Sequence, residues 1–148
     1  EVHPYEEVAY DLISLTNEVD SYGSGLVGYL PEEEPLVSFL KHVKEVMQCK
    51  VIKYAGADRP IKKVALCGGS GSFLLSDAKR HGADIFITAD YKYHQFFDAE
   101  NDIIIADIGH YESEQYTIQL IYDYLMQKNS NFALYCTKLN TNPVKYFI

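Results

Sequence analysis

The sequence predicts an α/β fold with a largely parallel sheet and flanking helices. Segments typical of strands alternate along the chain with segments of helical periodicity, a pattern that favours parallel strands joined by helices. Residues 84–88 and 102–106 are near-continuous apolar runs, as expected for strands that are buried on both faces. A chain of 148 residues can bury about 70% of its unfolded surface, so one domain can form without disulfide bonds or other cross-links.

In the first third of the chain, residues 8–15 are rich in β-branched and aromatic side chains and predict a strand. Residues 17–25 contain two glycines and predict a linker, and residues 26–30 predict a short strand. A helix is predicted over residues 36–47 because its apolar residues recur with helical period; they are Leu36, Phe39, Leu40, Val43, Val46 and Met47.

The remaining elements are predicted from the same patterns, which are strand-like apolar runs for strands and helical periodicity for helices. Gly82 marks the end of a helix over residues 73–81, because glycine is the usual residue just beyond a helix. The other predicted helices are residues 91–99 and 110–128, and the other predicted strands are residues 51–55, 63–67, 84–88, 102–106 and 132–137.

Composition and charge restrict the classes of function. The net charge of −8 makes nucleic acid an unlikely partner, and with no run of 18 apolar residues and no signal-peptide pattern we expect a soluble cytoplasmic protein without a membrane partner. The three cysteines form no C-x-x-C pair. Cys67 and Cys136 lie in apolar runs, so we expect both to behave as small buried hydrophobic residues.

Three predicted strand ends carry polar residues, and parallel strands would bring them to one edge of the sheet. The first is a glycine-rich turn, in which Gly69, Ser70, Gly71 and Ser72 could hold an anion on free backbone amides. The alternative is a simple strand-to-helix turn. The turn lacks the third glycine of a dinucleotide-binding loop and the lysine of a P-loop.

The second strand end carries Asp90 and His94. These side chains could be metal ligands, a general acid and base, or groups that orient a ligand or a water molecule. Asp90 could also simply cap the following helix.

The third strand end carries Asp107, followed by His110 and Glu114 four residues apart on a predicted helix. A histidine and a carboxylate at this spacing can share a divalent metal ion, whereas an ordinary surface pair is the alternative. Continuing the helix places Glu114 on the stripe of Ile118 and Leu125, so we expect a core-facing carboxylate, which is costly unless paired or metal-bound.

The residues 67–72, 88–94 and 108–114, in this order and spacing, resemble the motifs of the NIF-three-like family, whose members are also called GTP cyclohydrolase 1 type 2 homologs. The resemblance implies that residues 23–148 form the carboxyl-terminal half of the family's α/β domain. It implies that residues 1–22 are the tail of an inserted middle domain plus a linker. Because the first residue is Glu, we expect a part of a longer protein.

The resemblance also implies a site and an activity. His110 and Glu114 would be ligands of a dinuclear site for Zn, Fe, Mn or Ni, with Asp107 in support. The remaining ligands would lie in the absent amino-terminal half, so the fragment alone should bind metal weakly and be inactive. The complete protein would be a homohexamer and a metal-dependent hydrolase of a phosphorylated or nucleotide substrate. The alternative is a non-catalytic metal-binding scaffold or regulatory interaction protein.

Overall fold

The computed structural model describes residues 23–129 and 131–147. The strand predicted at residues 8–15, most of the predicted linker, and the segment assigned to an inserted domain lie outside these residues. In the described part of the chain, no helix is long and apolar enough to cross a membrane.

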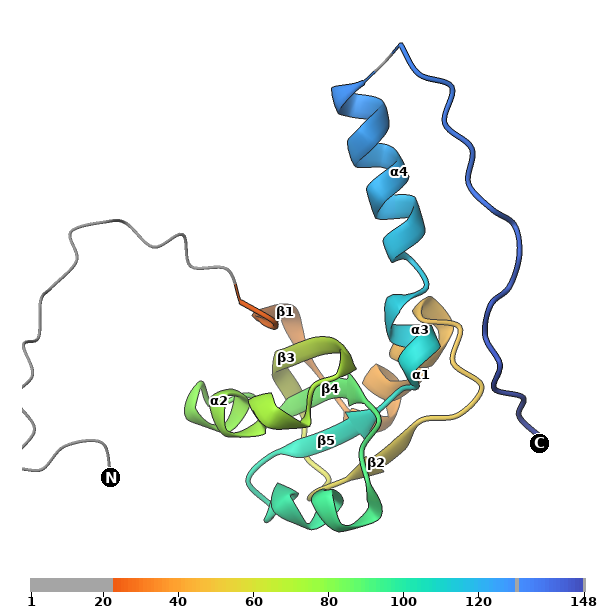
Figure 1. Cartoon of the computed structure of the whole chain (residues 1–148). Coiled ribbons are helices and arrows are strands. Elements are labelled where there is room, and N and C mark those ends of the chain that lie inside the picture. The colour runs from red at the N-terminus through yellow and green to blue at the C-terminus, as the bar shows by residue number, and fades with distance from the viewer. Residues whose placement is uncertain (1–22, 130, 148) are drawn as a thin grey trace, which may run out of the picture.

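A five-stranded mixed sheet forms the centre of the structure (Figure 1). The three middle strands, in the order β3, β4 and β5, are parallel, while the edge strands β1 and β2 run antiparallel to their neighbours. This confirms the predicted α/β fold with a largely parallel sheet. The strands are β1 (Leu26–Glu34), β2 (Lys53–Ala55), β3 (Ile61–Ser70), β4 (Ile85–Ala89) and β5 (Ile104–Asp107).

Helices cover the sheet and connect its strands. The segment predicted as one helix over residues 73–81 begins as a 3-10 turn, and within the segment predicted as a helix over residues 91–99 a 3-10 helix forms from Tyr93 to Ala99. The helical elements are α1 (Leu36–Val46), η1 (Ser72–Leu74), α2 (Leu75–Arg80), η2 (Tyr93–Ala99), α3 (His110–Glu114) and α4 (Thr117–Lys128).

The sheet is buried on both faces, as the apolar runs predict. On one face, Ile104 packs with α1 residues such as Phe39. On the other face, Ile105 packs with Phe86 and with Ala78 of α2. Successive residues of a strand point to opposite faces, and both Ile104 and Ile105 are fully buried. A continuous apolar run in β5 therefore supplies two cores at once.

The prediction of one long helix over residues 110–128 is wrong. The helix breaks at Gln115 and Tyr116, and α4 extends away from the body of the protein (Figure 1). Two hydrogen bonds hold this break against the end of α1. The side-chain amide of Gln115 donates to the Met47 carbonyl (2.8 Å), and the Tyr116 hydroxyl donates to the Val46 carbonyl (2.6 Å). As a result, Glu114 is half exposed rather than directed at a core.

The apolar residues of α4 do not form a core stripe. None of its described residues is buried. The exposed large apolar side chains of α4 are Ile118, Leu120, Ile121, Tyr124, Leu125 and Met126.

The prediction of a strand over residues 132–137 is also wrong. A strand needs a neighbour for its backbone hydrogen bonds, and neither edge strand of the sheet pairs with this segment. Cys136 is consequently exposed, in contrast to its predicted burial, whereas Cys49 and Cys67 are buried. Burial raises the pKa of the Cys49 thiol to about 11, which favours the unreactive protonated form.

Candidate functional site

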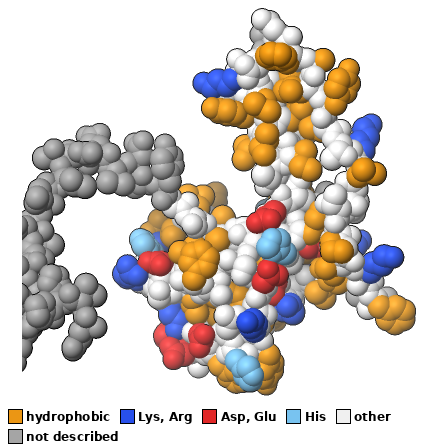
Figure 2. Space-filling model, in the orientation of Figure 1, with side chains coloured by type: hydrophobic (Ala, Val, Ile, Leu, Met, Phe, Trp, Pro, Cys, Tyr) orange, Lys and Arg blue, Asp and Glu red, His pale blue; other side chains and the backbone are white. Residues whose placement is uncertain are grey.

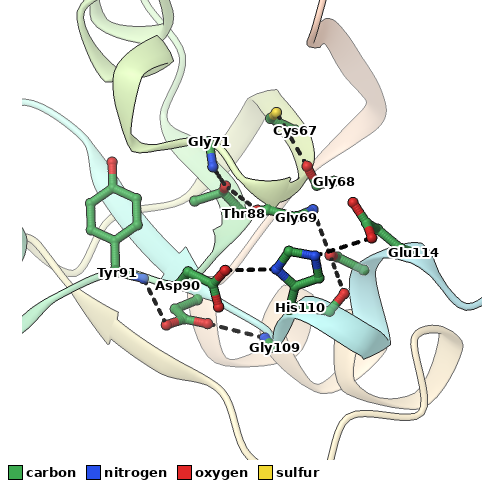
Figure 3. A network of polar contacts seen from close by, with 12 residues as sticks. Cys67, Gly68, Gly69, Gly71, Thr88, Asp90, Tyr91, Gly109, His110 and Glu114 are labelled. Carbon is green, nitrogen blue, oxygen red and sulfur yellow. Dashed lines mark hydrogen bonds and ion pairs between the residues drawn. The ribbon is translucent and has the colours of Figure 1, made fainter. Parts of the chain in front are cut away.

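The carboxyl ends of β3, β4 and β5 bring the predicted site residues to one edge of the sheet (Figure 3). Asp90 directly follows β4, and its φ of 58° turns the chain sharply away from the strand direction. Gly109 (φ 95°) turns the chain after β5 so that His110 begins α3. Asp90 and His110, twenty residues apart in sequence, therefore face each other.

Asp90, His110 and Glu114 form a continuous polar array (Figure 3). Nδ1 of His110 donates a hydrogen bond to Oδ2 of Asp90 at 2.6 Å, and Nε2 of His110 lies 3.2 Å from Oε2 of Glu114. The hydrogen bond to Asp90, and then the nearby charges of Asp90 and Glu114, raise the pKa of His110 above its ordinary value. This array unites three of the predicted site residues.

Replacing Asp90 with asparagine should lower the pKa of His110 towards that of an ordinary histidine. The raised pKa means that the contribution of this pair to stability is full below the unfolded-state pKa and is lost as the pH rises through the folded-state pKa. An NMR titration of the His110 ring in metal-free protein measures the change. Glu114→Gln should produce a smaller decrease, and an equal or larger decrease would contradict the dominant role of Asp90.

Gly69 lies directly against the side chains of Glu114 and His110. A Cβ atom at position 69 would lie 2.5 Å from Oε1 of Glu114 and 3.3 Å from Cε1 of His110, and the φ of this residue is +63°. The Gly69 amide donates to Oγ of Ser113 (2.8 Å), which in turn donates to the His110 carbonyl (2.8 Å). The position thus requires glycine both for its backbone conformation and for the space above it.

The predicted anion-binding turn is already hydrogen-bonded within the protein. In addition to the Gly69–Ser113 bond, the Gly71 amide donates to Oγ1 of Thr88 at 3.0 Å. Oγ1 of Thr88 donates onward to the Gly69 carbonyl at 3.1 Å. An anion could reach these two amides only by displacing Ser113 and Thr88, so the present geometry is that of a tight strand-to-helix turn.

Asp107 lies beneath the array as a buried structural junction. Its side chain is 3% exposed and forms an ion pair with Nζ of Lys53 (2.7 Å) on β2. The Tyr91 amide donates to Oδ2 at 3.2 Å, and the Gly109 amide donates to Oδ1 at 3.0 Å. Asp107 thereby joins the two chain segments that carry Asp90 and His110.

His94 is not part of the array. It lies exposed on η2, and its ring meets that of Tyr93 edge-on at 5.4 Å. Within residues 23–129 and 131–147, no hydrogen bond or ion pair connects His94 with Asp90, His110 or Glu114.

The buried carboxylate of α3 is Glu112, which the sequence prediction missed. It is 5% exposed, and its Oε1 accepts a hydrogen bond from the Tyr146 hydroxyl at 3.1 Å. Burial, followed by this bond, raises the pKa of Tyr146. Glu112 also contacts the backbone at Gly109, where a Cβ atom would overlap Oε2. In the sequence, the nearby Gly109 was a weak local signal for the burial of Glu112. Nothing in the sequence indicates the contact with Tyr146.

A pocket of about 640 Å³ opens beside the array, between α3 and the segment of residues 139–146. Its volume lies within the usual range of small-ligand sites. The polar side chains that line it include Lys53, Asp90, Asp107, His110, Glu112, Glu114 and Tyr146.

The array fits part of a metal site. Nε2 of His110 and Oε2 of Glu114 are close enough to serve one ion, and Asp90 holds Nδ1 in the manner of the carboxylates that orient metal-bound imidazoles. In the part of the chain that the structure describes, no group of three or more His, Cys, Asp or Glu side chains could hold a metal ion. Nε2 of His110 and Oε2 of Glu114 supply two donor atoms, fewer than a closed metal site needs.

Fold and site together define an α/β protein with a histidine–carboxylate array at the carboxyl ends of its parallel strands. The family model described as Duf34/NIF3 (NGG1p interacting factor 3) matches residues 4–143. The chain belongs to this family.

The relatives agree in fold and name. The chain is 35% identical to a "GTP cyclohydrolase 1 type 2 homolog" of Staphylococcus epidermidis over 97% of its own length, and 32% identical to that of Bacillus subtilis over the same share. A crystal structure of a Bacillus cereus protein related to NIF3 superposes with a TM-score of 0.75 at 35% identity, covering 98% of this chain and 41% of that one. The chain spans about 40% of the length of these curated relatives.

Proposed function

We propose that this chain is the carboxyl-terminal part of a longer NIF3-family protein and contributes His110 and Glu114 to a dinuclear site for divalent metal ions. The array in which Asp90 orients His110 towards Glu114 carries this proposal. The remaining ligands would come from the part of the relatives that this chain does not span, since it covers 40% of their length. The fragment alone should therefore bind metal weakly.

The activity that we propose is metal-dependent hydrolysis. When bound, the metal ions would activate water and polarise the substrate. Asp90 would keep the proton on Nδ1 of His110, so that Nε2 presents its lone pair to the ion. Asp107 would hold both chain segments in register from below. Among the described residues, His94 forms no hydrogen bond or ion pair with the array, and its predicted catalytic role stays a prediction.

The substrate and assembly are proposals at the level of the complete protein. The name of the relatives, GTP cyclohydrolase 1 type 2 homolog, supports a phosphorylated or nucleotide substrate. We propose a cytoplasmic homohexamer, as the family resemblance implies. Anion binding over residues 69–72 would require the backbone amides of Gly69 and Gly71 to give up their hydrogen bonds to Ser113 and Thr88.

A second function is favoured by the exposed apolar side chains of α4. A helix without a buried residue is more typical of a surface that contacts other protein. The family description "NGG1p interacting factor 3" points the same way. In this alternative the protein is a metal-binding scaffold without turnover.

The two functions are separated by His110→Ala in a protein extended to the length of the curated relatives. Metal content by mass spectrometry and metal-dependent product release from GTP should both fall by at least about tenfold, since a ligand is lost. His42→Ala, which changes an exposed histidine on α1, should leave both unchanged. Retained metal with equal turnover in His110→Ala would sink the hydrolase proposal. Loss of metal without any turnover in the parent protein would favour the scaffold.

A further inference from the structure

A second pocket lies between the edge strand β2 and the 3-10 helix η2. It has a volume of about 370 Å³ and is lined by Lys53, Tyr54, Ala55, Tyr93, Phe96 and Phe97. Figure 2 shows hydrophobic side chains gathered at the lower edge of the molecule, below the charged side chains of the same face. No role has been given to this aromatic pocket by the proposed metal chemistry.

The aromatic residues of η2 present ring surface to solvent. Tyr93 is 73% exposed and Phe97 is 66% exposed. Their centroids are 5.4 Å apart with an interplanar angle of 79°, so the two rings form a corner rather than covering each other. Phe96 is only partly buried, and its ring packs against buried Tyr91 with centroids 5.4 Å apart.

Lys53 connects this pocket with the array. Its side chain lines both the aromatic pocket and the pocket beside His110 and Glu114. The ammonium group is 2.7 Å from buried Asp107, yet the side chain is more than half exposed. A ligand that occupies both pockets would therefore contact this ammonium group.

We propose that the aromatic pocket binds the planar ring of a small ligand whose anionic group contacts Lys53 and whose remaining part extends towards His110 and Glu114. A flat aromatic or heteroaromatic ring suits exposed aromatic side chains, because stacking occurs on any π-face. The anionic group suits Lys53, which carries a positive charge and, among residues 23–129 and 131–147, is the residue that lines both pockets. The ligand is then a substrate of the proposed hydrolase, and this assignment rests on that function, but the ring site itself does not.

The test compares two probes that share one anionic group. Adenosine 5′-monophosphate carries a ring, and ribose 5-phosphate does not. Calorimetric titration of metal-free protein should show at least about fivefold tighter binding of the nucleotide, the lower limit expected for one stacked base. Phe97→Ala should remove that difference and leave the affinity for ribose 5-phosphate unchanged. Lys53→Met should weaken both probes.

Phe73→Ala is the matched control, since Phe73 is also 66% exposed but lies on η1. It should alter neither affinity. Equal affinities for the two probes in the parent protein would overturn the proposal, as would an equal effect of Phe73→Ala and Phe97→Ala. A change of assembly size in Phe97→Ala, measured by sedimentation, would overturn it in favour of an interface between copies. Because no metal is present, failure here is distinct from failure of the His110→Ala test.

Discussion

Replacing Asp107 with alanine is expected to destabilise the domain by about 2–4 kcal/mol. The substitution removes the acceptor of two backbone amides, those of Tyr91 and Gly109, together with the ion pair to Lys53. Each buried donor left without a partner costs about 1–3 kcal/mol. Urea unfolding followed by circular dichroism measures the loss as a lower midpoint at unchanged slope.

Lys53→Met separates the two contributions to this loss. It removes the cation but leaves both hydrogen bonds from the backbone amides to Asp107. Because Lys53 is exposed, water can replace part of the lost ion pair. The loss of stability should be clearly smaller than for Asp107→Ala. Equal losses of stability in the two variants would show that Asp107 stabilises the domain mainly through the ion pair and not through its hydrogen bonds to the two backbone amides.

Gly69→Ala is expected to weaken metal binding roughly 10- to 100-fold in a protein of the relatives' full length, comparable to the loss of a group that orients a ligand. The new Cβ atom would lie too close to Oε1 of Glu114 and Cε1 of His110. Both proposed ligands would have to move, and their spacing would change. Metal affinity is measured by competition with a chelator of known strength.

Gly82→Ala is a matched control for the backbone effect. Gly82 has a φ of +64°, close to the +63° of Gly69, but a Cβ atom there meets nothing within 4 Å. Both variants should lose about 1–2 kcal/mol of stability from the left-handed conformation, while only Gly69→Ala should lose metal affinity. Similar metal affinities in the two variants would contradict the proposed role of His110 and Glu114.

The fold was predictable because its main signals are local. The apolar runs of β4 and β5 require burial on both faces, and the alternation of elements requires parallel neighbours. These two conditions also bring Gly69, Asp90 and His110 to one edge, since parallel strands end on the same side. The array was therefore predictable in outline, although its distances depend on the turns at Asp90 and Gly109.

The misplaced carboxylate had a tertiary cause. The prediction extended a helical stripe from Glu114 into residues 117–128, but contacts with the end of α1 break the helix at Gln115. Glu112 is buried instead, through a hydrogen bond to Tyr146, 34 residues away in sequence. No local pattern encodes either contact.

The sequence does not show how the side chain of His94 lies relative to that of Asp90. His94 is four positions beyond Asp90, and two residues at this spacing share one face only if both belong to one α-helix. Here Asp90 precedes η2, with a positive φ, and η2 is a 3-10 helix with three residues per turn. Among the described residues, His94 is exposed and forms no hydrogen bond or ion pair with Asp90.

The Asp107 junction also has a consequence for the timing of local motions. Its single carboxylate accepts the amides of Tyr91 and Gly109, so the entrance to η2 and the entrance to α3 are latched by one group. Neither amide is free to exchange its proton with solvent while the latch is closed. The segments that carry Tyr91 and Gly109 should therefore open as one cooperative unit, and their two amides should exchange hydrogen at the same rate of opening.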